Sequence, residues 1–339
     1  MYNKQMKTIL VTGGLGYIGS HICIKLLENN YNLIVIDNLS NSSIEKLDVI
    51  KKHNKFDTNI YFYNIDLCDY EGLYRIVNLF IKTFDITIDT IIHLAGLKSV
   101  AESIQFPIKY YRNNLISTLN VTKIMEEFEI TNLIFSSSAT VYGNTSTPYN
   151  ENSQTGIGIT NPYGRSKYLQ EEFLKDISVK HQNWNIVLLR YFNPIGHVNI
   201  EFKELPNGIP NNLFPYLLKV SLGELKELTV FGSDYDTKDG TCSRDFIHVV
   251  DLANAHKVCC DHLLNQSIKG IKIYNVGTGN GITILELIHA FEKVNHTKLN
   301  YKIGSRRDGD LSSSYSDVSL IYKELDWKTE LTIDDCVKL

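Results

Sequence analysis

Short apolar runs alternate with helical patterns through the first half of the chain. Strands are predicted at Thr8–Thr12, Leu33–Asp37, Asn59–Asn64, Thr90–Leu94, Asn132–Ser136 and Asn185–Leu189. The helices predicted between them include Tyr17–Glu28, Pro107–Phe128 and Pro162–Val179. Near-continuous apolar strands separated by helices are typical of a parallel sheet that is covered on both faces. The pattern therefore predicts an α/β fold with a Rossmann-type, doubly wound parallel sheet.

The pattern changes after Asn193-Pro194. Residues 195–210 show no periodicity and are predicted to form a long excursion. Beyond it we expect helices at Asn212–Leu222, Val250–Leu264 and Thr283–Val294, and strands at Leu228–Phe231 and Lys272–Val276. We predict a cofactor-binding domain over residues 1–193 and a smaller α/β substrate-binding lobe over residues 194–339, with a return to the first domain around residues 242–275.

Composition narrows the possible partners. The net charge of -4 provides no basic footprint for nucleic acid or for an anionic membrane. Residues Met1–Lys7 contain no apolar signal core. The six cysteines show no CxxC spacing, which favours free thiols in a reducing cytoplasm. His248 and His256 have no third convergent ligand, so no metal site is predicted.

The first predicted strand continues directly into the glycine-rich segment Thr12-Gly13-Gly14-Leu15-Gly16-Tyr17-Ile18-Gly19. Glycines at positions 13, 16 and 19 permit a tight turn, close approach of a pyrophosphate, and close packing of helix against strand. The N–H groups and positive dipole end of the next helix favour phosphate. A purely structural turn is the alternative, but a strand before and a helix after the glycines favour dinucleotide binding.

An acidic residue closes the second predicted strand. Asp37 stands where a carboxylate can bind a ribose 2′-hydroxyl and would repel a 2′-phosphate. Because no arginine follows immediately, the sequence predicts NAD rather than NADP. Asp66-Leu67, after the third strand, is suited to the adenine, and Lys98, after the fourth, could steady the pyrophosphate or be a solvated surface lysine.

Tyr163 and Lys167 lie four residues apart on one face of a predicted helix. A free tyrosine has a pKa of about 10, and a nearby ammonium group lowers this pKa by roughly one to three pH units. The positive nicotinamide ring would add to the effect, so the pair predicts a general base. Ser138 follows the fifth strand, with Thr140 as its neighbour, and is predicted to relay the proton. A serine-rich capping turn is the alternative for Ser138.

A series of motifs carries a resemblance to a known family. In chain order they are TGGLGYIGSH, DNLSNS, HLAGLKSVAES, FSSSATVYG, NPYGRSK, LLRYFNPIG, GIPNNLFPY, DGTCSRDFIHV, YNVGTG and RRDGDL, from Thr8 to about Trp327. The chain resembles the 4-epimerase branch of the extended short-chain dehydrogenase/reductase family. Sister enzymes that remove water or carbon dioxide use an acidic residue just after the fifth strand. Ser138-Ala139-Thr140 offers no carboxylate there, which disfavours those activities.

The resemblance implies reversible, NAD-dependent 4-epimerisation of UDP-glucose and UDP-galactose. Tyr163 would take the proton from the sugar O4 while hydride passes from C4 to NAD. Hydride would then return to the other face of the 4-keto sugar. No net redox change occurs, so NAD would stay bound between turnovers, and Lys167 would also hold the nicotinamide ribose.

The resemblance also implies binding residues. Asn193, Asn212 and Leu213 would contact the diphosphate and uracil side, and Phe231 would line the uracil pocket. Arg244 and Arg307 would pair with the diphosphate, and Asp310 would hold the uridine ribose. Ser138, Tyr163 and Ser314 would face the sugar. The residues implied for NAD are Gly13, Gly16, Tyr17, Ile18, Gly19, Asp37, Asn38, Asn41, Ser42, Asp66, Leu67, Leu94, Ala95, Lys98, Asn113, Tyr163 and Lys167.

Three positions depart from the common pattern of the family or vary within it. Phe246 stands where many relatives have tyrosine, and Leu94 replaces a common aromatic residue. Ser314 would border the 2-substituent of the sugar, where a bulky tyrosine excludes N-acetyl groups. A serine there implies space for UDP-N-acetylglucosamine and UDP-N-acetylgalactosamine as well.

Two alternatives to this activity stay open. One is 4-epimerisation of another UDP-sugar, such as a pentose or a uronic acid. The other is a non-catalytic protein that senses a nucleotide sugar or NAD, although binding alone does not require Ser138, Tyr163 and Lys167 together. The resemblance further implies a homodimer formed through the helices at Pro107–Phe128 and Pro162–Val179.

Overall fold

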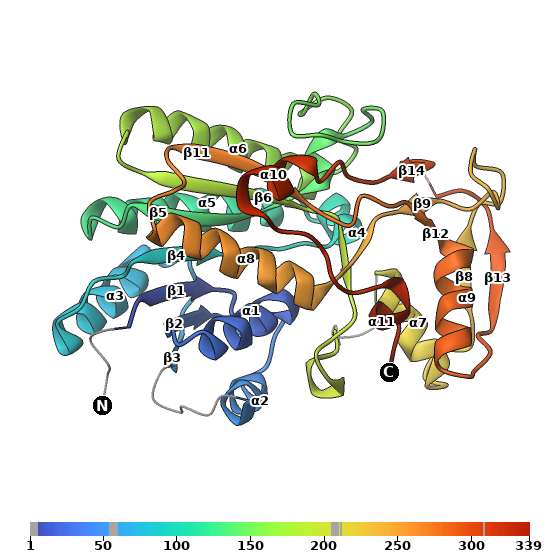
Figure 1. Cartoon of the computed structure of the whole chain (residues 1–339), viewed down its shortest axis with the longest axis horizontal. Coiled ribbons are helices and arrows are strands. Elements are labelled where there is room, and N and C mark those ends of the chain that lie inside the picture. The colour runs from blue at the N-terminus through green and yellow to red at the C-terminus, as the bar shows by residue number, and fades with distance from the viewer. Residues whose placement is uncertain (1–5, 54–59, 205–209, 211, 308) are drawn as a thin grey trace. The chain divides into compact units, whose positions relative to one another are not determined.

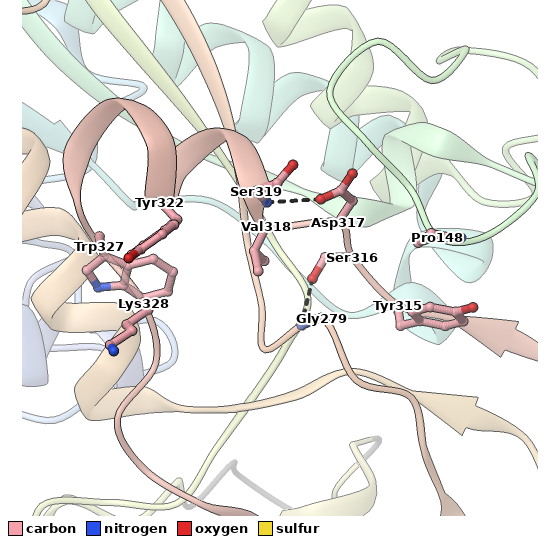
Figure 2. Close-up of a pocket in the computed structure, with 10 residues that line it drawn as sticks. All are labelled: Pro148, Gly279, Tyr315, Ser316, Asp317, Val318, Ser319, Tyr322, Trp327 and Lys328. Atoms are coloured by element: carbon pink, nitrogen blue, oxygen red, sulfur yellow. Dashed lines mark hydrogen bonds between the residues drawn. The ribbon is translucent and has the colours of Figure 1, made fainter.

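The computed structural model describes residues 6–53, 60–204, 210, 212–307 and 309–339. Asn59 of the third predicted strand and residues 205–209 of the predicted excursion lie outside the described residues. The chain groups into two compact units (Figure 1). The first unit comprises Met1–Val141, Asn161–Arg190 and Ala253–Tyr274, and the second comprises Tyr142–Thr160, Tyr191–Leu252 and Asn275–Leu339.

The first unit is built on a seven-stranded sheet in the order β3-β2-β1-β4-β5-β6-β11. The pairs β3–β2, β2–β1, β1–β4 and β4–β5 are parallel. The strands are β1 (Thr8–Thr12), β2 (Asn32–Asp37), β3 (Ile60–Asn64), β4 (Thr90–His93), β5 (Asn132–Ser138), β6 (Asn185–Tyr191) and β11 (Ile271–Val276). The predicted Rossmann-type parallel sheet is confirmed.

Helices cover both faces of this sheet (Figure 1). Leu10, Ile34 and Ile91 pack on one face with buried residues of the long helices. On the other face, a Cβ placed on Gly14, in the turn before the first helix, would lie 2.7 Å from Val35 of the sheet and 3.3 Å from Cys23 of that helix, so the helix packs closely on the sheet. The helices are α1 (Tyr17–Glu28), α2 (Glu45–His53), α3 (Tyr70–Phe84), α4 (Val100–Gln105), α5 (Pro107–Glu127), α6 (Pro162–Lys180) and α8 (Val249–Leu264), of which α8 enters the first unit at Ala253.

The start of α6 is fixed by its own sequence. Asn161 caps the helix, because its side-chain oxygen accepts a hydrogen bond of 2.8 Å from the Gly164 N–H. Pro162 occupies the first helical turn, where its missing N–H has no intrahelical partner to lose. Tyr163 therefore lies in the first turn of α6, two residues after the capping Asn161.

The second unit is formed from short strands and helices. The pairs β7–β10 and β8–β13 are parallel, and β9 lies between β12 and β14. Phe214, Val230, Leu287 and Phe291 belong to its apolar core. Its elements are β7 (Asn193–Ile195), α7 (Leu213–Ser221), β8 (Leu228–Phe231), β9 (Ser243–Arg244), β10 (Phe246–His248), β12 (Ile282–Thr283), α9 (Ile284–Val294), β13 (Tyr301–Gly304), β14 (Ser313–Ser314), α10 (Ser319–Leu325) and α11 (Ile333–Cys336). None of the described helices is both long enough and apolar enough to cross a membrane.

Candidate active site

The glycine turn after β1 has the close contacts that the sequence predicts. Gly13 has a φ of +70°, and a Cβ on it would lie 2.8 Å from the backbone nitrogen of Ala95. A Cβ on Gly19 would collide with the Gly13 carbonyl oxygen. Helix α1 begins after Gly16, and no described side chain caps it. A glycine-rich turn that leads to an uncapped helix N-terminus fits the pyrophosphate of a dinucleotide.

The predicted ribose-binding acid lies at the carboxyl end of β2. The Asp37 carboxylate is buried and accepts hydrogen bonds from the Leu15 N–H at 3.1 Å and the Leu39 N–H at 2.9 Å. The Ser42 hydroxyl donates to it at 2.8 Å. One oxygen of Asp37 therefore ties the glycine turn to the end of β2, and a carboxylate at this place is chemically suited to an NAD ribose.

The remaining predicted cofactor residues lie after the ends of neighbouring strands, in α1, or, for Asn113, in α5. The Asn38 amide donates to Asp66 at 3.2 Å, and the Leu67 carbonyl accepts from Asn120 at 2.7 Å. The Asn113 amide nitrogen lies 3.9 Å from Cys68 Sγ, beside this group. Lys98 and Asn41 are exposed, Leu94 and Ala95 follow β4, and Tyr17 and Ile18 open α1.

Asn114 was missed by the sequence analysis, which named only its neighbour. It is fully buried, and its side chain bonds the loop after β4 through the Leu97 N–H at 2.8 Å and the Leu97 carbonyl at 3.1 Å. The same amide donates to the Ser166 hydroxyl at 2.9 Å. Asn114 thus joins the loop after β4 to α6. No signal in one sequence distinguishes it from Asn113, because both lie in the same helical turn.

The predicted catalytic residues are brought together at the carboxyl end of β5. Lys167 is 4% exposed, and its Nζ donates to the Ser136 carbonyl at 2.6 Å. Ser138 is also buried, hydrogen-bonds the Tyr163 side chain, and accepts from the Thr140 hydroxyl at 3.0 Å. A Cβ on Gly96 would lie 3.9 Å from Lys167 Nζ. The loop after β4 therefore touches both Lys167 and the glycine turn.

Burial has the largest effect on the pKa values of Tyr163 and Lys167. It raises the pKa of Tyr163, and the hydrogen bond from Ser138 lowers that pKa in part. Burial also lowers the pKa of Lys167 to about 7, which the charge of Glu171 opposes. The net direction at Tyr163 is thus opposite to the predicted one, because enclosing the phenol disfavours its anion more than its surroundings favour it. The positive charge of a bound nicotinamide would lower the pKa of Tyr163.

The Ser138 hydrogen bond gives a testable pH dependence. Removing it in Ser138→Ala should raise the pKa of Tyr163, because this bond is what lowers it. Less phenolate then exists at any given pH, so the rising limb of kcat against pH should move to higher pH. Rates measured with UDP-galactose across a pH series would show the displacement. An unmoved limb would mean that Ser138 does not tune this proton transfer.

In the second unit, two predicted arginines share one predicted acid. Arg307 donates to Asp310 through Nε at 3.1 Å and Nη2 at 2.8 Å, and Arg244 lies 3.5 Å from the same carboxylate. The Arg307 guanidinium also lies over the Phe231 ring, 5.6 Å from its centroid. Its side chain is 58% exposed, so its guanidinium is accessible to an anion. Two cations around one acid suit a nucleoside diphosphate.

Ser314 lies on the strand next to Arg244. It pairs with Arg244 in the β14–β9 ladder and is half-buried. Asn193 is tied to the residue that follows Arg244, because its amide donates to the Asp245 carbonyl at 3.2 Å. Asn212 instead begins α7 with Leu213, and its described side-chain bond, at 3.3 Å, leads to Glu204. The structure therefore joins Arg244, Arg307, Asp310, Phe231, Ser314 and Asn193, while Asn212 and Leu213 lie on a separate element.

Asp245 is a second residue that the sequence analysis missed. It is fully buried, and one oxygen accepts from the Thr278 N–H and hydroxyl, both at 2.7 Å. The other accepts from the Gly279 N–H at 3.1 Å, the Ser316 N–H at 3.1 Å and the Ser316 hydroxyl at 2.5 Å. Asp245 thereby holds two segments, at Thr278-Gly279 and at Ser316, against the strand that carries Arg244. An acid between strand residues in SRDFIH was the available signal.

Metal ligands do not gather at either group. Among the described residues, no cluster of three or more histidine, cysteine, aspartate or glutamate side chains could hold a metal ion. All six cysteines are free thiols.

The chain matches one family over most of its length. Residues 9–277 match the NAD dependent epimerase/dehydratase family. The chain belongs to this family, an NAD-dependent one, and the predicted NAD cofactor and resemblance are confirmed. It is similar to the UDP-glucose 4-epimerase of Bacillus subtilis, at 45% identity over 96% of this chain and 94% of the relative. The human UDP-glucose 4-epimerase is 44% identical over 96% of this chain and 93% of the relative.

Solved structures agree with these relatives. UDP-glucose 4-epimerase from Bifidobacterium longum, in complex with NAD+ and UDP, superimposes with a TM-score of 0.90 at 46% identity, covering 98% of this chain and 96% of that one. The UDP-Glc/GlcNAc 4-epimerase from Campylobacter jejuni has a TM-score of 0.81 at 34% identity, covering 98% and 97%.

Proposed function

We propose that this protein catalyses the reversible 4-epimerisation of UDP-glucose and UDP-galactose through a 4-keto sugar. The observation that carries the proposal is the group formed at the end of β5 by buried Ser138, buried Lys167 and half-buried Tyr163, one loop away from the glycine turn. A tyrosine poised against a lysine and a serine serves proton transfer at a hydroxyl carbon. The full-length similarity to UDP-glucose 4-epimerases supports the same reaction.

The residues divide the work as follows. The glycine turn and Asp37 would hold NAD, which when bound would supply the group that accepts hydride from the sugar C4 and returns it. Tyr163 takes the proton from O4 as the carbonyl forms and gives it back when the carbonyl is reduced. Ser138 shares this proton through its hydrogen bond to the phenol. Lys167 would supply a positive charge near Tyr163, which stabilises the phenolate before it takes the proton.

The second unit would hold the nucleotide. Arg244 and Arg307 are suited to the diphosphate, and Asp310, which both now contact, to the uridine ribose. Phe231 offers a 42%-exposed ring for the uracil to stack on. Asn193, Asn212 and Leu213 would complete the contacts. We assign NAD to the first unit and the UDP moiety to the second.

The decisive test is incubation of the purified protein with UDP-galactose, without added NAD, while UDP-glucose is followed by proton NMR. Product would establish 4-epimerisation with a retained cofactor. If none forms even after NAD is added, the activity proposed here is wrong. UDP-pentoses and UDP-uronates would then be tried as substrates, and binding of UDP and NAD without turnover would favour a sensing protein.

Ser314 leads us to propose that N-acetylated UDP-sugars are also substrates. Ser314→Tyr would fill the space beside the sugar 2-position, so turnover of UDP-N-acetylglucosamine should fall by about a hundredfold or more while UDP-galactose turnover stays within a few-fold. Rates with both substrates, compared between the two proteins, measure this. If the native protein converts UDP-galactose and not UDP-N-acetylglucosamine, Ser314 does not confer the wider range.

We also propose a homodimer through α5 and α6. Apolar side chains remain exposed beside and along these helices, including Ile104 at 60%, Phe106 at 55%, Ile108 at 81% and Leu169 at 39%. A group of exposed apolar side chains of this kind is typical of a protein contact. A monomeric mass in solution scattering at micromolar concentration would contradict this proposal.

The six free thiols further support a cytoplasmic location.

A further inference from the structure

Three consecutive residues at the end of β5 hold three side chains from one face of α6. Ser138 bonds Tyr163, and the Ser136 carbonyl accepts from Lys167. Between them, the Ser137 hydroxyl donates to Glu171 at 2.5 Å. Because positions 163, 167 and 171 are each four residues apart, they form one row along the helix. The general base, its lysine and Glu171 are thus anchored to the same short stretch of strand.

Arg190 on β6 holds Glu171 from the other side. Its Nε donates at 3.0 Å and its Nη2 at 2.7 Å, so the contact is bidentate. The two side chains are 1% and 0% exposed, respectively. Desolvation of two buried charges largely offsets their attraction, so such a pair is weak evidence for stability. What the pair does supply is one defined position for the Glu171 carboxylate.

The position of the Glu171 carboxylate matters because of the charges around Lys167. The titratable groups described around it are Tyr163 and Glu171 on α6, His93 on β4, and Arg190 on β6. Burial, together with the charge of Lys167, lowers the pKa of His93 to about 3, so His93 stays neutral. Glu171 is the group whose charge favours protonated Lys167 against the effect of burial.

We propose that Glu171, fixed by Arg190 and Ser137, is a positioning residue that keeps Lys167 charged and directed toward Tyr163 through the catalytic cycle. This inference rests on the proposed 4-epimerase function and adds a residue to its machinery. Glu171 does not touch substrate or cofactor in this scheme; it acts through Lys167. Without its charge, a larger fraction of Lys167 would be neutral at working pH, and the phenolate of Tyr163 would lose its stabilising neighbour.

The test compares Glu171→Gln with the native holoenzyme. For UDP-galactose, kcat at neutral pH should fall by about ten- to a hundredfold while KM changes little. The falling alkaline limb of the kcat profile should move to lower pH, because Lys167 loses its proton earlier once the negative charge is gone. Glu172→Gln, on the next residue, is the matched control: Glu172 forms a half-buried pair with Lys175, away from the Glu171–Arg190 contact, and the profile of this variant should be native.

A double variant separates positioning from folding. Glu171→Gln alone leaves Arg190 as a buried unpaired charge, which can unfold the protein. Glu171→Gln with Arg190→Met removes both charges and should restore the thermal midpoint, yet its alkaline limb should remain displaced. A native profile in this double variant would show that Glu171 serves stability alone and would overturn the proposal.

A readout that needs no turnover keeps this inference distinct from the proposed function. The ultraviolet difference absorbance of tyrosinate, with Tyr163→Phe as the blank, reports the titration of Tyr163 in the holoenzyme. In Glu171→Gln that titration should move to higher pH. An unchanged titration would overturn the role of Glu171 even if UDP-galactose is converted. A displaced titration without any conversion would retain that role and reject the reaction.

Discussion

Replacing Tyr163 by phenylalanine should lower the turnover of UDP-galactose by about a thousandfold or more, because general acid–base catalysis at one site contributes at this scale. The phenol hydroxyl is the group that would take the O4 proton, and the substitution removes only that oxygen. The ring stays in the first turn of α6, where Asn161 and Pro162 fix the backbone independently of the hydroxyl. KM and the NAD content of the purified protein should therefore change by no more than a few-fold.

Tyr168→Phe is the matched control for this loss. Tyr168 lies on the same helix, one residue after Lys167, and is only half-buried, so removing its hydroxyl should leave turnover near the native value. Proton NMR on all three proteins, at equal content of bound NAD, gives the comparison. Turnover by Tyr163→Phe within about tenfold of the native protein would exclude Tyr163 as the base.

Much of the first unit could be predicted from the sequence because its signals are local. The bounds of β1 and α1 coincide with the predicted Thr8–Thr12 and Tyr17–Glu28, since an unbroken apolar run and a glycine turn define them within a few residues. The two-residue strands β9, β12 and β14 were not predicted. A strand of two residues has no periodicity, and its pairing partner lies far away in the chain.

The candidate site divides in the same way. The spacing of Tyr163 and Lys167 is a helical repeat and could be found without a structure. The side chains that fix this pair could not, because Glu171 meets Ser137 across 34 residues of chain and Arg190 across 19. The direction of the Tyr163 pKa was also out of reach. It depends on how completely the phenol is enclosed, and burial is a property of the packed unit rather than of the motif.

Asp245 shows how much of the second unit depends on a residue that touches no ligand in the proposed scheme. Its carboxylate is fully buried and accepts five hydrogen bonds from Thr278, Gly279 and Ser316. Each oxygen receives at least one backbone N–H. Those donors come from segments 33 to 71 residues away in the chain. Asp245 therefore joins the loop after β11 and the strand that carries Ser314 to the strand that carries Arg244.

Asp245→Asn should accordingly destabilise the second unit by about 3 kcal/mol, because the new amide group must point donors at a buried backbone N–H whichever way it is turned. The urea midpoint of this unit should fall by roughly 1 M or more. Loosening of β14 should also raise KM for UDP-galactose, since Ser314 pairs with Arg244. The value of kcat should change less, because the Tyr163 group belongs to the first unit.

The two tryptophans allow the loss of stability to be assigned to one of the two units. Trp327 belongs to the second unit and Trp184 to the first, so urea unfolding followed by fluorescence in a Trp184→Phe background reports the unit that holds Asp245. Asp236→Asn applies the same substitution to an exposed residue of that unit and should keep the native midpoint. If Asp245→Asn unfolds at the same urea concentration as this control, the five hydrogen bonds do not hold the segments together. The arrangement of Arg244 and Ser314 would then have to depend on the apolar core around Val230 and Phe291 alone.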